Sequence, residues 1–137
     1  MTEDLQKKYL EYQFLQRVIN QMHQKKAIIQ NQINEFSGLM ENLDNIKKSK
    51  KDSSMYAAIG SGVFVKAELK ETNNVLVNIG SNVVIERSNE DSKKLVDNQL
   101  KELSNLSKKI DKEIESSIER SNVLEKELSE LNDKKTE

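Results

Sequence analysis

Two short segments in the middle of the chain decide its fold: Ile59-Gly60-Ser61-Gly62-Val63 and, twenty residues later, Ile79-Gly80-Ser81-Asn82-Val83. Each places Gly, Ser or Asn between β-branched residues, and Gly and Asn tolerate the positive φ angles that tight hairpin turns require. Three of the four glycines of the chain lie in these two segments. The repeat therefore predicts two similar β-hairpins.

The runs that flank the turns have the composition of strands. Four short stretches rich in Val and Ile lie between residues 55 and 87, and turn residues separate them. Alternation places Val63, Val65, Ala67 and Leu69 on one face of a strand. Because the rest of the chain uses its apolar residues elsewhere, we expect neighbouring subunits to cover this face and to close the strands into an intersubunit barrel.

On both sides of the strands the hydrophobic period changes to 3.5 residues. From residue 3 to about 50, counting from Leu5, ten of thirteen a and d positions are apolar and the other three are Lys. From 89 to 134, eight of twelve such positions are apolar, and Ser88 is expected to cap this helix. Stripes of this length predict a coiled coil, with each helix roughly 70 Å long.

Similar lengths on either side of a compact insert indicate that the two helices are antiparallel. We expect a register that sets Ile33 opposite Leu103. The predicted fold is mainly α: one domain over residues 1–137, with a helix at 3–50, two inserted β-hairpins over 55–87 and a return helix at 89–134.

Composition excludes several classes of protein. The chain has no Cys and therefore no disulfide scaffold, thiolate zinc site or Cys nucleophile. No apolar run of about 18 residues exists, and the opening Thr2-Glu3-Asp4 is unlike a signal peptide, so we expect a soluble, cytoplasmic protein without membrane contact. The 22 basic residues match 23 acidic ones, which does not favour nucleic acid binding.

Catalysis is not expected, and neither is a metal site or a cofactor. The single histidine, His23, lies beside the helix seam without a catalytic partner. The basic cluster Lys47-Lys48-Ser49-Lys50-Lys51 is interpreted as the compensation of a helix dipole in preference to a phosphate site.

One apolar cluster falls off the helix seam. Tyr9, Leu10 and Phe14, with Val123 on the second helix, occupy heptad positions that a two-helix seam does not bury. Exposed apolar clusters usually mark contact with another molecule. Stray surface residues at a helix end are an equally good interpretation.

Taken together, the long helix, the two Ile-Gly-Ser-x-Val hairpins and the return helix resemble the alpha-class subunit of archaeal-type prefoldin. The most specific stretches are residues 60–69 and 75–86. In having two hairpins, the chain resembles the alpha class, because the beta class has one. This chain departs from the family in having Tyr56-Ala57-Ala58 where Pro often precedes the first strand.

The resemblance implies an ATP-independent co-chaperone, a hexamer of two alpha-class and four beta-class subunits. It implies that coiled-coil tips hold non-native client proteins and deliver them to a group II chaperonin. Assembly would fall on Ile59, Val63, Val65, Val75, Val77, Ile79, Val83 and Ile85. Client contact would fall on Leu5, Tyr9, Leu10, Phe14, Val123, Leu124, Leu128 and Leu131. A filament-forming alpha-like relative, or a structural or adaptor coiled coil, is the alternative.

Overall fold

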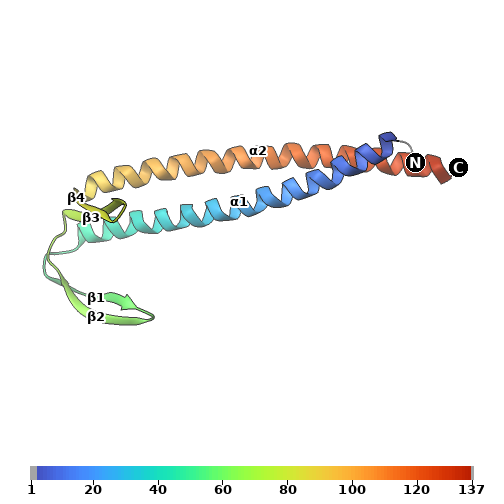
Figure 1. Cartoon of the computed structure of the whole chain (residues 1–137). Coiled ribbons are helices and arrows are strands. Elements are labelled where there is room, and N and C mark those ends of the chain that lie inside the picture. The colour runs from blue at the N-terminus through green and yellow to red at the C-terminus, as the bar shows by residue number, and fades with distance from the viewer. Residues whose placement is uncertain (1–2, 137) are drawn as a thin grey trace. The chain divides into compact units, whose positions relative to one another are not determined.

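The computed structural model describes residues 3–136, and the side chains of 3–134 (Figure 1). Along the sequence, two β-hairpins lie between two long helices, which confirms the predicted fold class. Residues 1, 2 and 137 of the predicted domain lie outside the described residues. The elements are α1 (Glu3–Lys48), β1 (Ser53–Gly60), β2 (Val63–Leu69), β3 (Asn74–Gly80), β4 (Val83–Ser88) and α2 (Asn89–Thr136).

The chain divides into two compact units. The first, here called the helical unit, contains the described residues up to Ile33 and those from Leu103 onward. The second, the hairpin unit, spans Asn34–Glu102 and so contains all four strands together with the adjoining parts of α1 and α2.

The seam of the helical unit is apolar at its centre. Ile29, Ile110 and Ile114 are buried together, and Met22, Ile33 and Leu103 pack against them. Ile33 and Leu103, paired by the expected register, therefore belong to one cluster. Every predicted seam position at 5–43 and at 93–131 is buried or half-buried, which fits a heptad pattern; Lys47 is the exposed exception.

Polar residues in this seam have partners across it. The Gln16 side-chain amide donates a hydrogen bond of 2.6 Å to the hydroxyl of Ser121, which is only 4% exposed. Lys26 forms an ion pair with Asp111. Ser121 is buried, and a buried polar group is tolerated only when it is paired, so its bond to Gln16 favours this register. The Lys26–Asp111 pair is more open to solvent and adds less.

The two hairpins share one turn geometry. In each, the two loop residues have positive φ: Ser61 (37°) and Gly62 (80°) in the first, and Ser81 (49°) and Asn82 (61°) in the second. Positive φ at both central residues defines the type I′ turn, whose twist matches that of the flanking strands.

The residues before each turn repeat as well. Gly60 (φ 141°) pairs with Val63 and Gly80 (φ 113°) pairs with Val83, and in both hairpins the pairing shifts just before the glycine. Each hairpin therefore carries one β-bulge beside its turn. The repeat in the sequence produces a repeat in the backbone.

Asn89 joins three segments of the hairpin unit. It is 2% exposed, its backbone N–H donates to the carbonyl of Asn73 at 2.6 Å, and its side-chain amide donates to the carbonyls of Leu43 at 3.0 Å and Thr72 at 3.5 Å. Its side chain thus ties the start of α2 to α1 and to the β2–β3 connection.

The first turn of α2 is capped as predicted. The hydroxyl of Ser88 accepts a hydrogen bond of 3.1 Å from the backbone N–H of Asp91. Such a bond satisfies one of the backbone donors that a helix N-terminus leaves free.

Two ion pairs join α1 to α2 near this cap. Lys47 pairs with Glu90 at 2.5 Å, and Lys93 pairs with Asp44. Hydrogen bonds from these lysines hold the pKa of Glu90 and that of Asp44 below their ordinary values.

Candidate functional site

The residues predicted to contact clients lie in the helical unit and differ in exposure. Tyr9, Leu10, Phe14 and Val123 are exposed by 52%, 62%, 58% and 47%. Leu5 and Leu124 are buried, and Leu128 and Leu131 are half-buried. We call these eight residues the terminal surface. Only its first four members offer a large free apolar area, and the other four support the helices from inside.

The exposed members of the terminal surface point to more than one side of the helix pair. Leu10 and Phe14 are one helical turn apart on α1, so they are neighbours on its surface. Tyr9 instead lines a groove of about 480 Å³, together with Leu5, Tyr12 and Leu128. Apolar surface is therefore available on two sides.

Ion pairs hold the helices together at this level. The Nε and Nη2 atoms of Arg120 donate to the two carboxylate oxygens of Glu11 at 3.0 and 3.2 Å, which raises the pKa of Arg120. Lys8 bridges Glu127 at 3.3 Å and Asp4 at 3.6 Å, and its pKa is raised chiefly by the bond to Glu127. The Arg120–Glu11 pair is exposed, and the Lys8–Glu127 pair is half-buried. Ion pairs open to solvent orient the helices more than they stabilise them.

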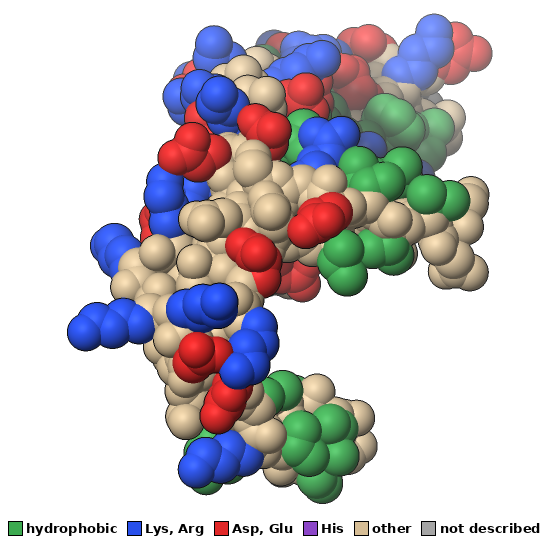
Figure 2. All heavy atoms as spheres, turned by 90° about the vertical axis from the view of Figure 1, so that its left-hand side faces the viewer, with side chains coloured by type: hydrophobic (Ala, Val, Ile, Leu, Met, Phe, Trp, Pro, Cys, Tyr) green, Lys and Arg blue, Asp and Glu red, His purple; other side chains and the backbone are tan. Residues whose placement is uncertain are grey.

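The residues predicted to mediate assembly lie on the two hairpins and are largely uncovered. Ile59, Val63, Val65, Ile79 and Val83 are exposed by 44–65%. The other three are half-buried: Val75, Val77 and Ile85. Figure 2 shows hydrophobic side chains gathered over the lower hairpin, β1–β2, and again above it at the level of β3–β4.

Strand register explains why the first hairpin exposes apolar groups on both faces. Val65 lies opposite Ala57 on one face, whereas Phe64 lies opposite Ala58 on the other. Tyr56, on the same face as Phe64, is 70% exposed. The sequence interpretation assigned one face to assembly and did not include Tyr56.

Each hairpin also leaves its outer edges open. In the described chain, β1 pairs only with β2 and β3 only with β4, so the hairpins are separate two-stranded sheets. Unpaired edges present a row of free N–H and C=O groups to a further strand. Both the faces and the edges of the hairpins are suited to contact with another chain.

Two lateral grooves were not predicted. In the hairpin unit, a groove of about 800 Å³ lies between β3 and the helices, lined by Leu39, Leu43, Val77, Leu95 and others. The signal for it was present in the sequence, since Leu39 and Leu95 are apolar residues off the seam.

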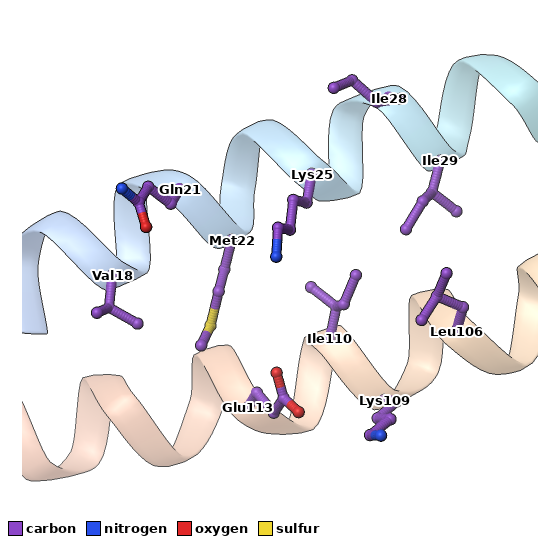
Figure 3. Close-up of a pocket in the computed structure, with 10 residues that line it drawn as sticks. All are labelled: Val18, Gln21, Met22, Lys25, Ile28, Ile29, Leu106, Lys109, Ile110 and Glu113. Atoms are coloured by element: carbon purple, nitrogen blue, oxygen red, sulfur yellow. The ribbon is translucent and has the colours of Figure 1, made fainter.

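The second lateral groove lies in the helical unit and has a volume of about 420 Å³. Val18, Met22 and Ile29 point from α1 toward α2, and Leu106 and Ile110 point back toward α1 (Figure 3). We call it the flank groove. Its remaining lining residues are Gln21, Lys25, Ile28, Lys109 and Glu113.

The described residues contain no group of three or more His, Asp or Glu side chains that could hold a metal ion. His23 is exposed on α1. Within the described part of the chain, no helix is both long and apolar enough to span a membrane.

Comparison with known proteins agrees with this geometry. The family model described as "Prefoldin subunit" matches residues 15–134. Prefoldin subunit alpha of Pyrococcus horikoshii is 30% identical over 108 residues, which cover 78% of this chain and 73% of that protein. Prefoldin subunit alpha 1 of Thermococcus kodakarensis is 26% identical over 101 residues, covering 74% and 69%.

A solved structure has the same fold. The chain in the cryo-EM structure of filamentous PFD from Methanocaldococcus jannaschii superposes with a TM-score of 0.76 at 16% identity, covering 87% of this chain and 98% of the other. The family model covers most of the sequence, and both of these curated relatives are alpha subunits. The chain therefore belongs to the prefoldin family, in its alpha class.

Proposed function

We propose that this chain is a subunit of an ATP-independent co-chaperone that holds non-native proteins on its terminal surface. Prefoldins are non-enzymatic chaperones. The observation that carries the proposal is the exposure of Tyr9, Leu10 and Phe14, three large apolar side chains within two turns of α1. Apolar area of this kind binds the apolar segments that an unfolded protein exposes.

The physical requirements of such a holding function are modest. Each contact is weak and relatively unspecific, because the surface is shallow and its groove is open. Several copies in one assembly raise the effective concentration of binding sites, so that weak contacts add up to retention. A protein that binds the unfolded form preferentially withdraws it from aggregation by mass action.

We further propose that the hairpins assemble with other prefoldin subunits, two alpha-class with four beta-class. The exposed apolar side chains and open edges of β1–β2 and β3–β4 support this assignment. Delivery of the client to a group II chaperonin, in the cytoplasm, completes the proposed activity and rests on family membership.

Replacement of Tyr9, Leu10 and Phe14 by Ser tests the proposal. We expect the variant to bind an unfolded client about tenfold more weakly, equivalent to roughly 1.4 kcal/mol, and to suppress its aggregation less. The measurement is light scattering of a thermally unfolding client protein, with mass determination to verify an unchanged assembly.

The matched control replaces Gln6, Lys7 and Gln13 by Ser. These residues are exposed on the same helix, and their replacement by Ser costs at least as much helix propensity but removes no large apolar group. If both variants suppress aggregation as well as the original chain, the terminal surface does not hold clients.

Two alternatives differ in their assembly. The fold neighbour from Methanocaldococcus jannaschii is described as filamentous, and at 16% identity this likeness concerns the fold alone. A filament would have an indefinite mass, whereas a structural or adaptor coiled coil would form a small oligomer indifferent to a beta-class partner. Mass measurement of the chain, alone and mixed with a beta-class subunit, separates these from the defined hexamer that we propose.

A further inference from the structure

Methionine is the residue type of this chain that is most open to mild oxidation. The sequence contains four methionines and neither Cys nor Trp. A peroxide converts the thioether of an accessible methionine into a sulfoxide, and in this chain no thiol competes for the oxidant. Oxidation by a peroxide is therefore expected at methionine, and the exposure of each methionine decides where it occurs.

The described methionines differ in exposure. Met22 and Met40 are half-buried on α1. Met55, on β1, is 43% exposed and is the only methionine among the exposed large apolar side chains of the described residues. Met1 lies outside the described residues. Met55 is therefore the described methionine that a dissolved oxidant reaches most easily.

Strand register places Met55 on an uncharged face of the first hairpin. Residues two apart on a strand share a face, so the face of Met55 also carries Ser53, Ala57, Val65, Ala67 and Leu69. The opposite face carries the charged Lys66 and Glu68. Because the face of Met55 includes Val65, it is the face on which we expect another subunit to pack.

The residue opposite Met55 explains why its side chain is open to solvent. Met55 pairs with Ala67, and the two Cβ atoms of such a pair lie about 4.5–5.5 Å apart. Ala67 ends at its Cβ, so the opposite residue has no side-chain atoms that extend over the longer methionine. The hairpin itself therefore gives the thioether little cover, and a second chain packed on this face would supply it.

A sulfoxide at Met55 would place a hydrogen-bond acceptor on this apolar face. Among the described residues of the face, only Ser53 has a polar side chain, and its hydroxyl already donates to the backbone carbonyl of Lys50. A subunit that covers the face would thus bury the sulfoxide oxygen without a partner from this hairpin. Burial of an unpaired polar group costs free energy, and the added oxygen also changes the shape of the face.

We propose that Met55 is a modification site through which hydrogen peroxide controls the assembly of this protein. The thioether sulfur attacks one oxygen of the peroxide and the O–O bond breaks. The transferred oxygen gives its proton to the departing hydroxide, which leaves as water. The sulfur loses two electrons, and the peroxide gains them.

The consequence differs between the free and the assembled subunit, and it rests on the proposed assembly through the Val65 face. The free subunit exposes Met55 and is open to oxidation. The oxidised subunit no longer packs on its partner, whereas a subunit that has already assembled is protected. Oxidation thus removes free subunits from assembly and spares those that have a partner.

Mild treatment with hydrogen peroxide tests the site, on the free chain and on the chain assembled with a beta-class subunit. Peptide mapping by mass spectrometry measures the oxygen added at each methionine. In the free chain we expect Met55 to be oxidised several-fold faster than Met22 and Met40, and in the assembly several-fold more slowly than in the free chain. Equal rates at Met55 in the two states would overturn the proposal.

Mass measurement after mixing with the beta-class subunit tests the effect on assembly. We expect the oxidised chain to assemble about tenfold more weakly or worse, because its sulfoxide would be buried unpaired. Methionine sulfoxide reductases for both sulfoxide epimers, with a dithiol as reductant, should restore assembly. Undiminished assembly of the oxidised chain would contradict the proposal.

The matched control is Met55→Leu, because leucine keeps the apolar volume and has no sulfur to oxidise. Peroxide should leave the assembly of this variant unchanged. The variant Met22→Leu with Met40→Leu retains Met55 and should still lose assembly on treatment. If treated Met55→Leu loses assembly as the original chain does, the effect belongs to other residues and the proposal fails.

The untreated chain separates a failure of this inference from a failure of the proposed function. If the untreated chain forms no assembly with the beta-class subunit, the proposed assembly and the inference both fail. If it assembles and oxidation of Met55 has no effect, the inference alone fails and the proposed assembly stands.

Discussion

At the scale of single residues, the backbone conformation of Gly80 explains why glycine occupies that position. Its φ of 113° lies in a region that L-residues with a side chain rarely adopt, and open space surrounds the position where a Cβ would be. The constraint is therefore conformational and not steric. Gly60, with φ of 141°, occupies the equivalent position in the first hairpin.

Replacing Gly80 by Ala is expected to destabilise the β3–β4 hairpin by about 1–3 kcal/mol, because Ala would have to hold this φ. Hydrogen exchange of the hairpin amides reports the local change, and we expect it to accelerate by about tenfold or more. The control is Gly38→Ala in α1, where open space also surrounds the Cβ position. There we expect the opposite sign, a gain of about 0.5–1 kcal/mol in helix stability. Slower or unchanged exchange in the Gly80 variant would contradict this account.

At the scale of elements, local sequence patterns predicted the helices and the cap, whereas contacts between segments distant in the sequence were not predicted. The seam followed from the 3.5-residue period, and the Ser88 cap followed from the residues beside it. The role of Asn89 could not be predicted, because its bonds to Leu43 and Thr72 depend on how segments distant in the sequence come together. The lateral grooves were missed for the same reason, although off-seam residues such as Ile28 mark them.

The two ion pairs at the α1–α2 junction predict a dependence on pH. Asp44 and Glu90 have a lower pKa in the folded chain than their ordinary values of 3.8 and 4.5, because Lys93 and Lys47 bond to them. Their contribution is thus present above those values and is lost as pH falls through the lower folded pKa. We expect Asp44→Asn with Glu90→Gln to lower the unfolding temperature at pH 7.

That difference from the original chain should shrink as the pH falls below the ordinary values of 3.8 and 4.5, and it should disappear below the lowered folded pKa values of the two carboxyl groups. It should also shrink in high salt, because both carboxylates are open to solvent. Calorimetry at matched concentration measures it. Glu35→Gln with Glu102→Gln removes two exposed charges without an ion pair and serves as the control. A pH-independent difference would exclude the ion pairs as its cause.

At the scale of the whole molecule, many of the apolar side chains are not buried within the chain itself. Ten large apolar side chains on the strands are exposed, among them Tyr56, Leu76 and Ile79. Apolar residues make up only 35% of the chain, yet a large share lies outside its own core. This distribution fits a chain that completes its hydrophobic burial by association.

We predict that Val65→Asp blocks this association while helix content persists, because the change places a charge on the face shared with Ala57. Mass measurement with a beta-class subunit and far-UV circular dichroism are the readouts. Lys66→Asp places the same residue on the opposite face of β2 and should still assemble. Assembly of the Val65 variant would show that this face is not part of the interface.

The bulges before Gly60 and Gly80 also limit which strands can extend the hairpins. A bulge increases the right-handed twist of its strand, and two-stranded ribbons are already the most strongly twisted sheets. We therefore expect the open edges to be strongly twisted beside the turns, where a flat strand would pair poorly. Fibrils grow by stacking flat, in-register strands. We therefore expect the bulge beside each turn to hinder the growth of such fibrils from the uncovered edges of this chain.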